Sequence, residues 1–73
     1  MFEVHVEHLS APGMENSLRA FSIGVRRIAV MEIIDRWPAA SHEYIKLLGD
    51  DGALYILRHD EGSKRWELTL FQA

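Results

Sequence analysis

The stretch that decides the fold is EYIKLLGDDGALYILRH, residues 43–59, in which two largely apolar runs flank a turn of glycine and aspartate. Aspartate favours turn positions, and Gly52 can adopt the left-handed backbone conformation that closes a bulged hairpin loop. The apolar runs contain the β-branched and aromatic residues that pack well on a sheet. The stretch therefore predicts a β-hairpin.

Two registers of this hairpin are open. With Asp50, Asp51 and Gly52 in the loop, Ile45 lies opposite Leu57 and Leu47 lies opposite Tyr55, and the other face carries Tyr44, Lys46, Leu48, Leu54, Ile56 and Arg58. With only Asp50 and Asp51 in the loop, the partners of Ile45 and Leu47 are Ile56 and Leu54. In both registers each face holds several large apolar side chains, whereas a face exposed to water should be polar. We therefore expect one face to fill a core and the other to be covered by residues 10–24 or by a second subunit.

Further strands are predicted on both sides of the hairpin. Residues 2–7 alternate apolar with charged or histidine side chains, a period of two that indicates a strand with one wet face. Residues 25–36 are rich in β-branched side chains and predict a long strand. After a turn at residues 61–64, the run WELTLF (66–71) predicts a last strand with Trp66, Leu68 and Leu70 on one face.

The region before residue 36 permits two fold classes. A short helix or irregular segment at about 14–22, followed by the strand, gives a mainly β protein: a five-stranded antiparallel meander that closes into a small SH3-like barrel. The alternative is an α+β fold, with one helix over residues 17–36 packed on a four-stranded antiparallel sheet. Leu18, Phe21 and Val25 have helical spacing, but Gly24 costs about 1 kcal/mol inside a helix. We prefer the barrel.

Length and composition predict one small domain that depends on a partner. A chain of 73 residues buries only about 60% of the surface that its unfolded form exposes. It contains no cysteine, so disulfides and cysteine-based metal sites are excluded. With 48% hydrophobic residues, the expected reinforcement is self-association, and a dimer is favoured.

Charge and hydropathy restrict the partners. The net charge of −3 disfavours sequence-independent binding to a phosphate backbone. No secretory signal is recognisable, and the longest apolar run is five residues, far short of the roughly 20 that span a bilayer. We therefore expect a soluble cytoplasmic protein that does not enter a membrane.

Candidate binding residues gather near the hairpin: Trp37, Tyr44, Lys46, Tyr55, Arg58, His59 and Asp60. Aromatic rings beside basic groups can stack nucleobases or peptides. His59 with Asp60 is the best acid–base pair, but neighbouring residues on a strand point in opposite directions. We prefer a simpler interpretation of residues 58–60 as a charged strand end, in which Arg58 pairs with a cross-strand acid such as Glu43 and Asp60 caps the following turn.

No residue pattern predicts catalysis, a metal or a cofactor. The sequence lacks a phosphate-binding glycine loop, a nucleophile elbow and a zinc-protease motif. His5 shares a predicted strand face with Glu3 and Glu7, but these three would hold a metal only with a further ligand, and a solvated strand face is the better explanation.

The predicted function is accordingly a non-enzymatic binding or assembly module that self-associates through an apolar sheet face. Two alternatives stay open: binding of single-stranded nucleic acid or small anions by the aromatic and basic residues, and binding of a small molecule in the barrel. The short runs at residues 35–37, 43–47, 50–52, 55–60 and 66–68 resemble runs in short bacterial proteins. That resemblance implies no activity and no ligand.

Overall fold

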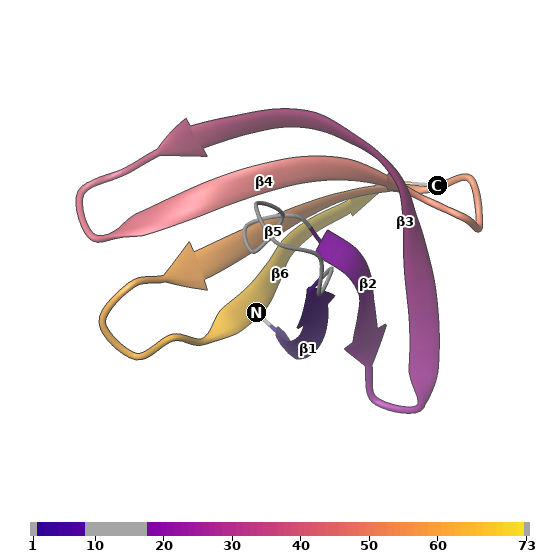
Figure 1. Ribbon diagram of the computed structural model, residues 1–73, viewed down its shortest axis with the longest axis horizontal. Coiled ribbons are helices and arrows are strands. Elements are labelled where there is room, and N and C mark those ends of the chain that lie inside the picture. The colour runs from indigo at the N-terminus through magenta and orange to yellow at the C-terminus, as the bar shows by residue number, and fades with distance from the viewer. Residues whose placement is uncertain (1, 9–17, 73) are drawn as a thin grey trace.

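The computed structural model describes residues 2–8 and 18–72, which form six antiparallel strands and no helix (Figure 1). The strands are β1 (Phe2–His8), β2 (Leu18–Ile23), β3 (Arg26–Pro38), β4 (His42–Gly49), β5 (Leu54–Asp60) and β6 (Trp66–Gln72). Each strand pairs with the next along the chain, and β6 pairs with β1, so the meander closes into a barrel. The predicted mainly β barrel is confirmed, with six strands in place of five.

The additional strand is β2, and it makes the helical alternative for residues 17–36 wrong. Residues 18–23 and 26–38 form a hairpin, and Gly24 at its turn has a φ of +60°, which glycine adopts without strain. The short helix or irregular segment predicted at about 14–22 is likewise replaced by strand from residue 18 onward; its residues 14–17 lie outside the described part of the chain.

The helix-like spacing of Leu18 and Phe21 has a specific cause in β2. Their separation of three would place them on opposite faces of a regular strand. However, the pairing of β1 with β2 shifts by one residue: Glu7 lies across from Ala20, but the next residue, His8, lies across from Leu18. Leu18 and Phe21 can therefore both be buried in the barrel. An irregularity in the strand pairing thus imitated a helical pattern.

The central hairpin adopts the register with the three-residue loop, and the two-residue loop is wrong. Ile45 lies across from Leu57, and Leu47 lies across from Tyr55. These four side chains are at most 2% exposed. Gly52 closes the loop with a φ of +81°. The inner face of the hairpin therefore supplies the centre of the core.

The core fills the barrel with buried side chains from every strand: Val4, Leu18, Phe21, Ile28, Ile45, Leu47, Ala53, Tyr55, Leu57 and Trp66. Phe21 meets the ring of Tyr55 edge-on, with 4.9 Å between ring centroids. Edge-to-face packing of aromatic rings is favourable beyond the area that it buries. No helix among the described residues has the length and apolar character needed to cross a lipid bilayer.

The last strand departs from the predicted alternation. Its pairing with β5 shifts between Ile56 and Leu57, so that Leu68 lies across from Leu57 but Leu70 lies across from Ile56. Leu70 therefore lies on the outer face, half exposed, and Phe71 takes the inward position. The prediction that Leu68 and Leu70 share a face is wrong, because a β-bulge reverses the direction of every side chain that follows it.

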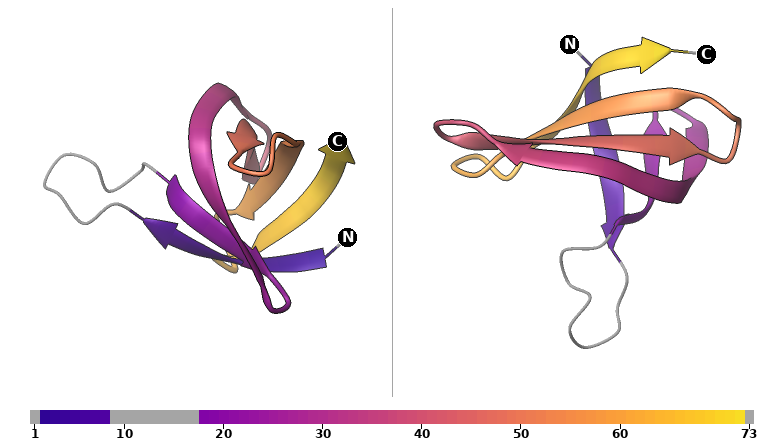
Figure 2. Two further views of the ribbon diagram at one scale, coloured as in Figure 1. Left: turned by 90° about the vertical axis from the view of Figure 1, so that its right-hand side faces the viewer. Right: turned by 90° about the horizontal axis from the view of Figure 1, so that it is seen from above.

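The closure of the barrel is short. Residues 2–4 of β1 pair with residues 66–68 of β6. Within the described part of the chain, residues 69–72 of β6 pair with β5 alone, because β6 runs past the start of β1. Figure 2 shows the end of β6 pointing away from the N-terminal end of β1. The barrel therefore has an open end, formed by the β2–β3 turn, the β4–β5 loop and the last residues of β6.

Gly49 offers a test of how tightly this end is packed. A Cβ atom at Gly49 would lie 2.7 Å from Cγ2 of Ile28 and 3.0 Å from the ring of Tyr55, both of them buried. We expect Gly49→Ala to lower the free energy of unfolding by about 1–3 kcal/mol through overpacking. Urea denaturation measures the change. Gly62→Ala is the matched control, because its Cβ would meet only the Asp60 side chain, at 3.4 Å. Equal stability of the two variants would contradict this packing.

Candidate functional site

The residues predicted as a binding site do not form one surface. Strand alternation and register place Trp37, Tyr44, Lys46 and Arg58 on the outer face of β3–β5, Tyr55 and His59 on the inner side, and Asp60 at the end of β5. Tyr55 is buried in the core and is separated from the outer group by the sheet itself. The outer group, the charged strand end and the open end of the barrel are therefore distinct places.

In the outer group, aromatic rings pack on one another. Trp37 and Tyr44 are stacked with their ring centroids 5.5 Å apart and an interplanar angle of 24°. Trp37 lies within β3, and not in a loop. His42 meets Tyr44 edge-on at 5.1 Å. The three rings form a continuous aromatic row at the far end of the β3–β4 ribbon.

Two arginines near this row have acidic partners. Arg58 donates from Nη1 to Glu67 across 2.9 Å, and the predicted partner Glu43 instead accepts a hydrogen bond from Arg36 at 3.0 Å. The predicted pairing of Arg58 with a cross-strand acid is confirmed, but the partner is Glu67 and not Glu43, the example named from the sequence. On the strand Glu43 points to the inner side with His59, whereas Glu67 lies directly across from Arg58. The charge of Arg58 on the outer face is therefore compensated by Glu67.

His59 and Asp60 do not converge on a common point. The His59 ring stacks on Trp66 with 4.1 Å between centroids and an interplanar angle of 7°. Burial lowers the pKa of His59, so its imidazole is neutral at neutral pH. Asp60 accepts hydrogen bonds from the amides of Ser63 and Gly62, and these bonds lower its pKa. Asp60 therefore caps the turn, as predicted for a charged strand end.

At the open end lies a polar network that the sequence did not indicate. The Oδ2 atom of Asp51 accepts hydrogen bonds from the Tyr55 hydroxyl and, at 2.8 Å, from Nη2 of Arg26. Its Oδ1 atom accepts from the Ala53 amide at 3.0 Å. Arg26 and Asp51 are 25 residues apart, and the pairing of β3 with β4 brings them together, with the Asp50 amide bonded to the Ala29 carbonyl at 2.9 Å. The network ties the β2–β3 hairpin to the β4–β5 loop.

The network has fixed protonation states at neutral pH. The Tyr55 hydroxyl, by donating to Asp51, lowers the pKa of that carboxyl, and the nearby Arg26 acts in the same direction. Burial and the Asp51 charge together raise the pKa of Tyr55 to about 12. Asp51 is therefore ionised and Tyr55 keeps its proton. Both carboxylate oxygens of Asp51 accept hydrogen bonds within the network. Arg26 uses only Nη2 for this contact, so its other N–H groups are the donors that Asp51 does not engage.

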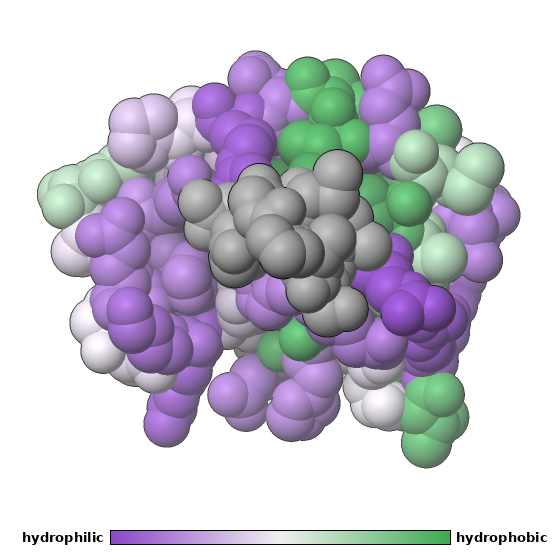
Figure 3. Space-filling model, in the orientation of Figure 1, coloured by the Kyte–Doolittle hydropathy of each residue, from purple (hydrophilic) through white to green (hydrophobic). Residues whose placement is uncertain are grey.

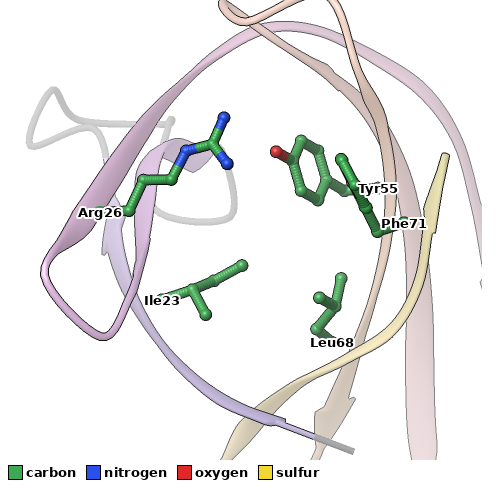
Figure 4. Close-up of a pocket in the computed structure, with 5 residues that line it drawn as sticks. All are labelled: Ile23, Arg26, Tyr55, Leu68 and Phe71. Atoms are coloured by element: carbon green, nitrogen blue, oxygen red, sulfur yellow. The ribbon is translucent and has the colours of Figure 1, made fainter. Parts of the chain in front are cut away.

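A hollow of about 140 Å³ adjoins this network and is lined by Ile23, Arg26, Tyr55, Leu68 and Phe71. Figure 4 shows the Arg26 guanidinium and the Tyr55 hydroxyl pointing toward each other on one side of the hollow, with Ile23 and Leu68 facing each other on the other side. The Phe71 ring lies 5.1 Å from that of Tyr55, at 34°. The hollow is therefore apolar with one cationic corner.

On the outer face of the sheet, four aliphatic side chains form an outer apolar patch: Leu48, Leu54, Ile56 and Leu70. Leu48 lies across from Leu54, and Ile56 lies across from Leu70. Leu70 is 50% exposed and the other three are half-buried. The backbone of each described strand comes close only to its two neighbours in the barrel, so no described strand crosses the patch. In particular, the part of residues 10–24 that is described forms barrel wall and does not cover it.

Other exposed hydrophobic side chains lie on β3 and at its first turn. Met31 and Ile34 are exposed where the pairing of β3 with β4 shifts, and Val25 is fully exposed at the β2–β3 turn. Figure 3 shows hydrophobic surface around the arc of β3 and a separate hydrophobic tip at that turn. Val25 lies apart at the turn, whereas Met31 and Ile34 lie on β3, which pairs with β4.

The structure gives no support to a metal site at the N-terminal strand. Among residues 2–8 and 18–72, no group of three or more His, Cys, Asp or Glu side chains is placed to hold a metal ion. Glu3, His5 and Glu7 are exposed, and Glu7 pairs with Arg27 at 2.8 Å. On this face of β1, Glu7 is therefore neutralised by Arg27 of β3.

The Tyr55–Asp51 hydrogen bond predicts a specific loss of stability at alkaline pH. Folding raises the pKa of Tyr55 from 10.0 to about 12, so the associated stabilisation is complete below pH 10 and is lost as the pH rises toward 12. We expect the free energy of unfolding of the natural protein to fall across this interval, and to fall less in Tyr55→Phe. Urea denaturation over a pH series measures both. Tyr44→Phe, the control, should keep the full decline; a Tyr55→Phe curve parallel to it would contradict the assignment.

Comparison with known proteins adds no further residue to these sites. No protein-family model, no curated protein and no solved structure matches this chain.

Proposed function

We propose that this protein is a self-associating binding module in which two copies join through the outer apolar patch. The observation that carries the proposal is the adjacency of Leu48, Leu54, Ile56 and Leu70 on the outside of a barrel whose inside is already filled. Contiguous apolar surface on a small protein indicates a site of interaction. The patch supports association and not catalysis, because it contains no group that could transfer a proton or attack a substrate.

The size of the molecule makes a second copy an effective stabiliser. A standard interface buries about 800 Å² of each partner, roughly a sixth of the 4855 Å² surface of this chain. Burial of apolar area contributes about 25 cal/mol per Å², before the entropic cost of association is subtracted. A chain of this length has a small core, so an interface of this kind would add a substantial fraction to its stability.

The charges around the patch suit a second copy of the same surface. Lys46 lies across from Asp35, and Arg58 is bonded to Glu67, so both signs occur on the outer face of β3–β6. A surface that carries both signs can meet itself about a twofold axis without net repulsion. The presence of both charge signs around the patch therefore favours a homodimer over a strongly charged partner.

Binding of single-stranded nucleic acid has less support from the geometry. Such surfaces combine a positively charged groove with aromatic faces on which bases stack. Here Trp37 and Tyr44 stack on each other, and Arg58 is held by Glu67. The net charge of −3 acts in the same direction. These features favour a protein partner for the outer face.

Light scattering across a dilution series tests the proposal. We expect the natural protein to approach twice its monomer mass of 8.4 kDa at high micromolar concentration and to dissociate on dilution. Ile56→Glu places a charge in the middle of the patch and should raise the dissociation constant at least about tenfold. Its new carboxylate can pair with Lys46 across the strands, so the folded monomer should persist.

Val25→Glu is the matched control, because it exchanges another exposed aliphatic residue for glutamate at the β2–β3 turn, outside the patch. This variant should dimerise like the natural protein. A natural protein that stays monomeric at high micromolar concentration would refute the proposal, as would equal dissociation constants for the two variants.

A further inference from the structure

We infer that the hollow at the open end of the barrel binds a small carboxylate whose apolar part is a single ring or a short branched chain. The hollow is lined by Ile23, Leu68, Phe71, the ring of Tyr55 and the side chain of Arg26. None of the apolar lining residues belongs to the outer apolar patch. This site is therefore independent of the proposed dimer interface.

The size and lining of the hollow set the apolar half of the ligand. Its volume is about 140 Å³. A cavity of about 150 Å³ lined by Leu, Ile and Phe holds one benzene molecule, so one ring or a chain of similar bulk fits here. Aromatic and aliphatic walls are also the usual lining of small-molecule sites. A fused ring system would be too large to enter fully.

Phe71 lines the hollow with a ring that is only half covered by the protein. Phe71 packs against Tyr55 but remains 48% exposed. It belongs to residues 69–72 of β6, which pair with β5 alone within the described part of the chain. A ligand ring in the hollow would cover Phe71, and the free strand edge beside it offers backbone hydrogen-bonding groups. Covering this apolar surface supplies a driving force for binding.

The polar corner selects the charge of the ligand. Asp51 holds the Arg26 guanidinium through one nitrogen at 2.8 Å, and the Arg26 side chain is still 60% exposed. Oδ2 of Asp51 already accepts two hydrogen bonds, Oδ1 accepts one from the Ala53 amide, and the Tyr55 hydroxyl donates its proton to Asp51. The groups left for a ligand are the other N–H donors of Arg26, which suit a carboxylate. An ammonium group would place a positive charge beside the Arg26 guanidinium and is therefore disfavoured.

Three single-ring probes separate the apolar and the charged contributions. Benzoate, benzyl alcohol and benzylamine are titrated, each to about 50 mM at constant ionic strength, into ¹⁵N-labelled protein while amide shifts are recorded. We expect saturable shifts around the hollow with benzoate, with a dissociation constant on the order of 1–10 mM for a ligand of this size. Benzyl alcohol should bind several-fold more weakly, and benzylamine should not saturate. Absence of saturable shifts with benzoate, or equal affinity for benzylamine, would overturn the inference.

Variants then assign the binding to this hollow. Arg26→Gln should weaken benzoate about tenfold and leave benzyl alcohol within about twofold. Arg27→Gln is the matched control, since this neighbouring arginine pairs with Glu7 and does not line the hollow. Equal loss of benzoate affinity in both variants would show a general charge effect and overturn the site.

Two further variants change the apolar wall. Ile23→Phe should fill the hollow and abolish the shifts with benzoate and benzyl alcohol. Phe71→Ala removes a half-exposed ring at the surface and should weaken both probes equally, which keeps the test decisive if Ile23→Phe does not fold. Unchanged affinity in a folded Ile23→Phe, or in Phe71→Ala, would place the probes elsewhere and contradict the inference.

Discussion

The structure depends on one constraint: the β4–β5 hairpin is apolar on both sides, and a closed barrel can bury only one of them. The inner side, with Ile45, Leu47, Tyr55 and Leu57, is sealed from water. The outer side keeps aliphatic residues on a surface that no described strand crosses. Because the described residues form a single layer of strands, none of these strands crosses the second side, and the proposed dimer would bury it. The proposed dimer interface and the filled core are therefore two consequences of one sequence pattern.

Local patterns predicted the parts of the fold that depend on near neighbours. The hairpin was predicted from the turn at Asp50–Gly52 and from the apolar runs on both sides of it. The observed register is one of the two that this pattern allowed. The β-branched residues of 25–36 predicted most of β3, and the Asp60 turn followed from the charged run after β5. In each case the determining interaction lies within a few residues along the chain, where strand period and turn chemistry are decisive.

The remaining features depend on contacts between distant residues. Register shifts after Glu7 and Ile56 change which face Leu18 and Leu70 occupy, and such bulges have no dependable signature in a single sequence. The Arg26–Asp51 pair forms only when the β2–β3 turn meets the β4–β5 loop. Because this pairing could not be predicted, Tyr55 was expected among the binding residues. In the barrel its ring is buried in the core and its hydroxyl bonds Asp51. The candidate hollow was equally out of reach, because its five lining residues come from four strands.

In the proposed dimer, the outer side of the hairpin is open in a single chain and covered when two chains assemble. Solvent paramagnetic relaxation of methyl groups, measured with an inert gadolinium chelate at low and high protein concentration, tests it most directly. We expect relaxation of the Leu48, Leu54, Ile56 and Leu70 methyls to fall as concentration rises, while the Leu47 and Leu57 methyls are shielded throughout. Outer methyls that stay equally accessible at every concentration, or inner methyls that prove as accessible as the outer ones, would contradict it.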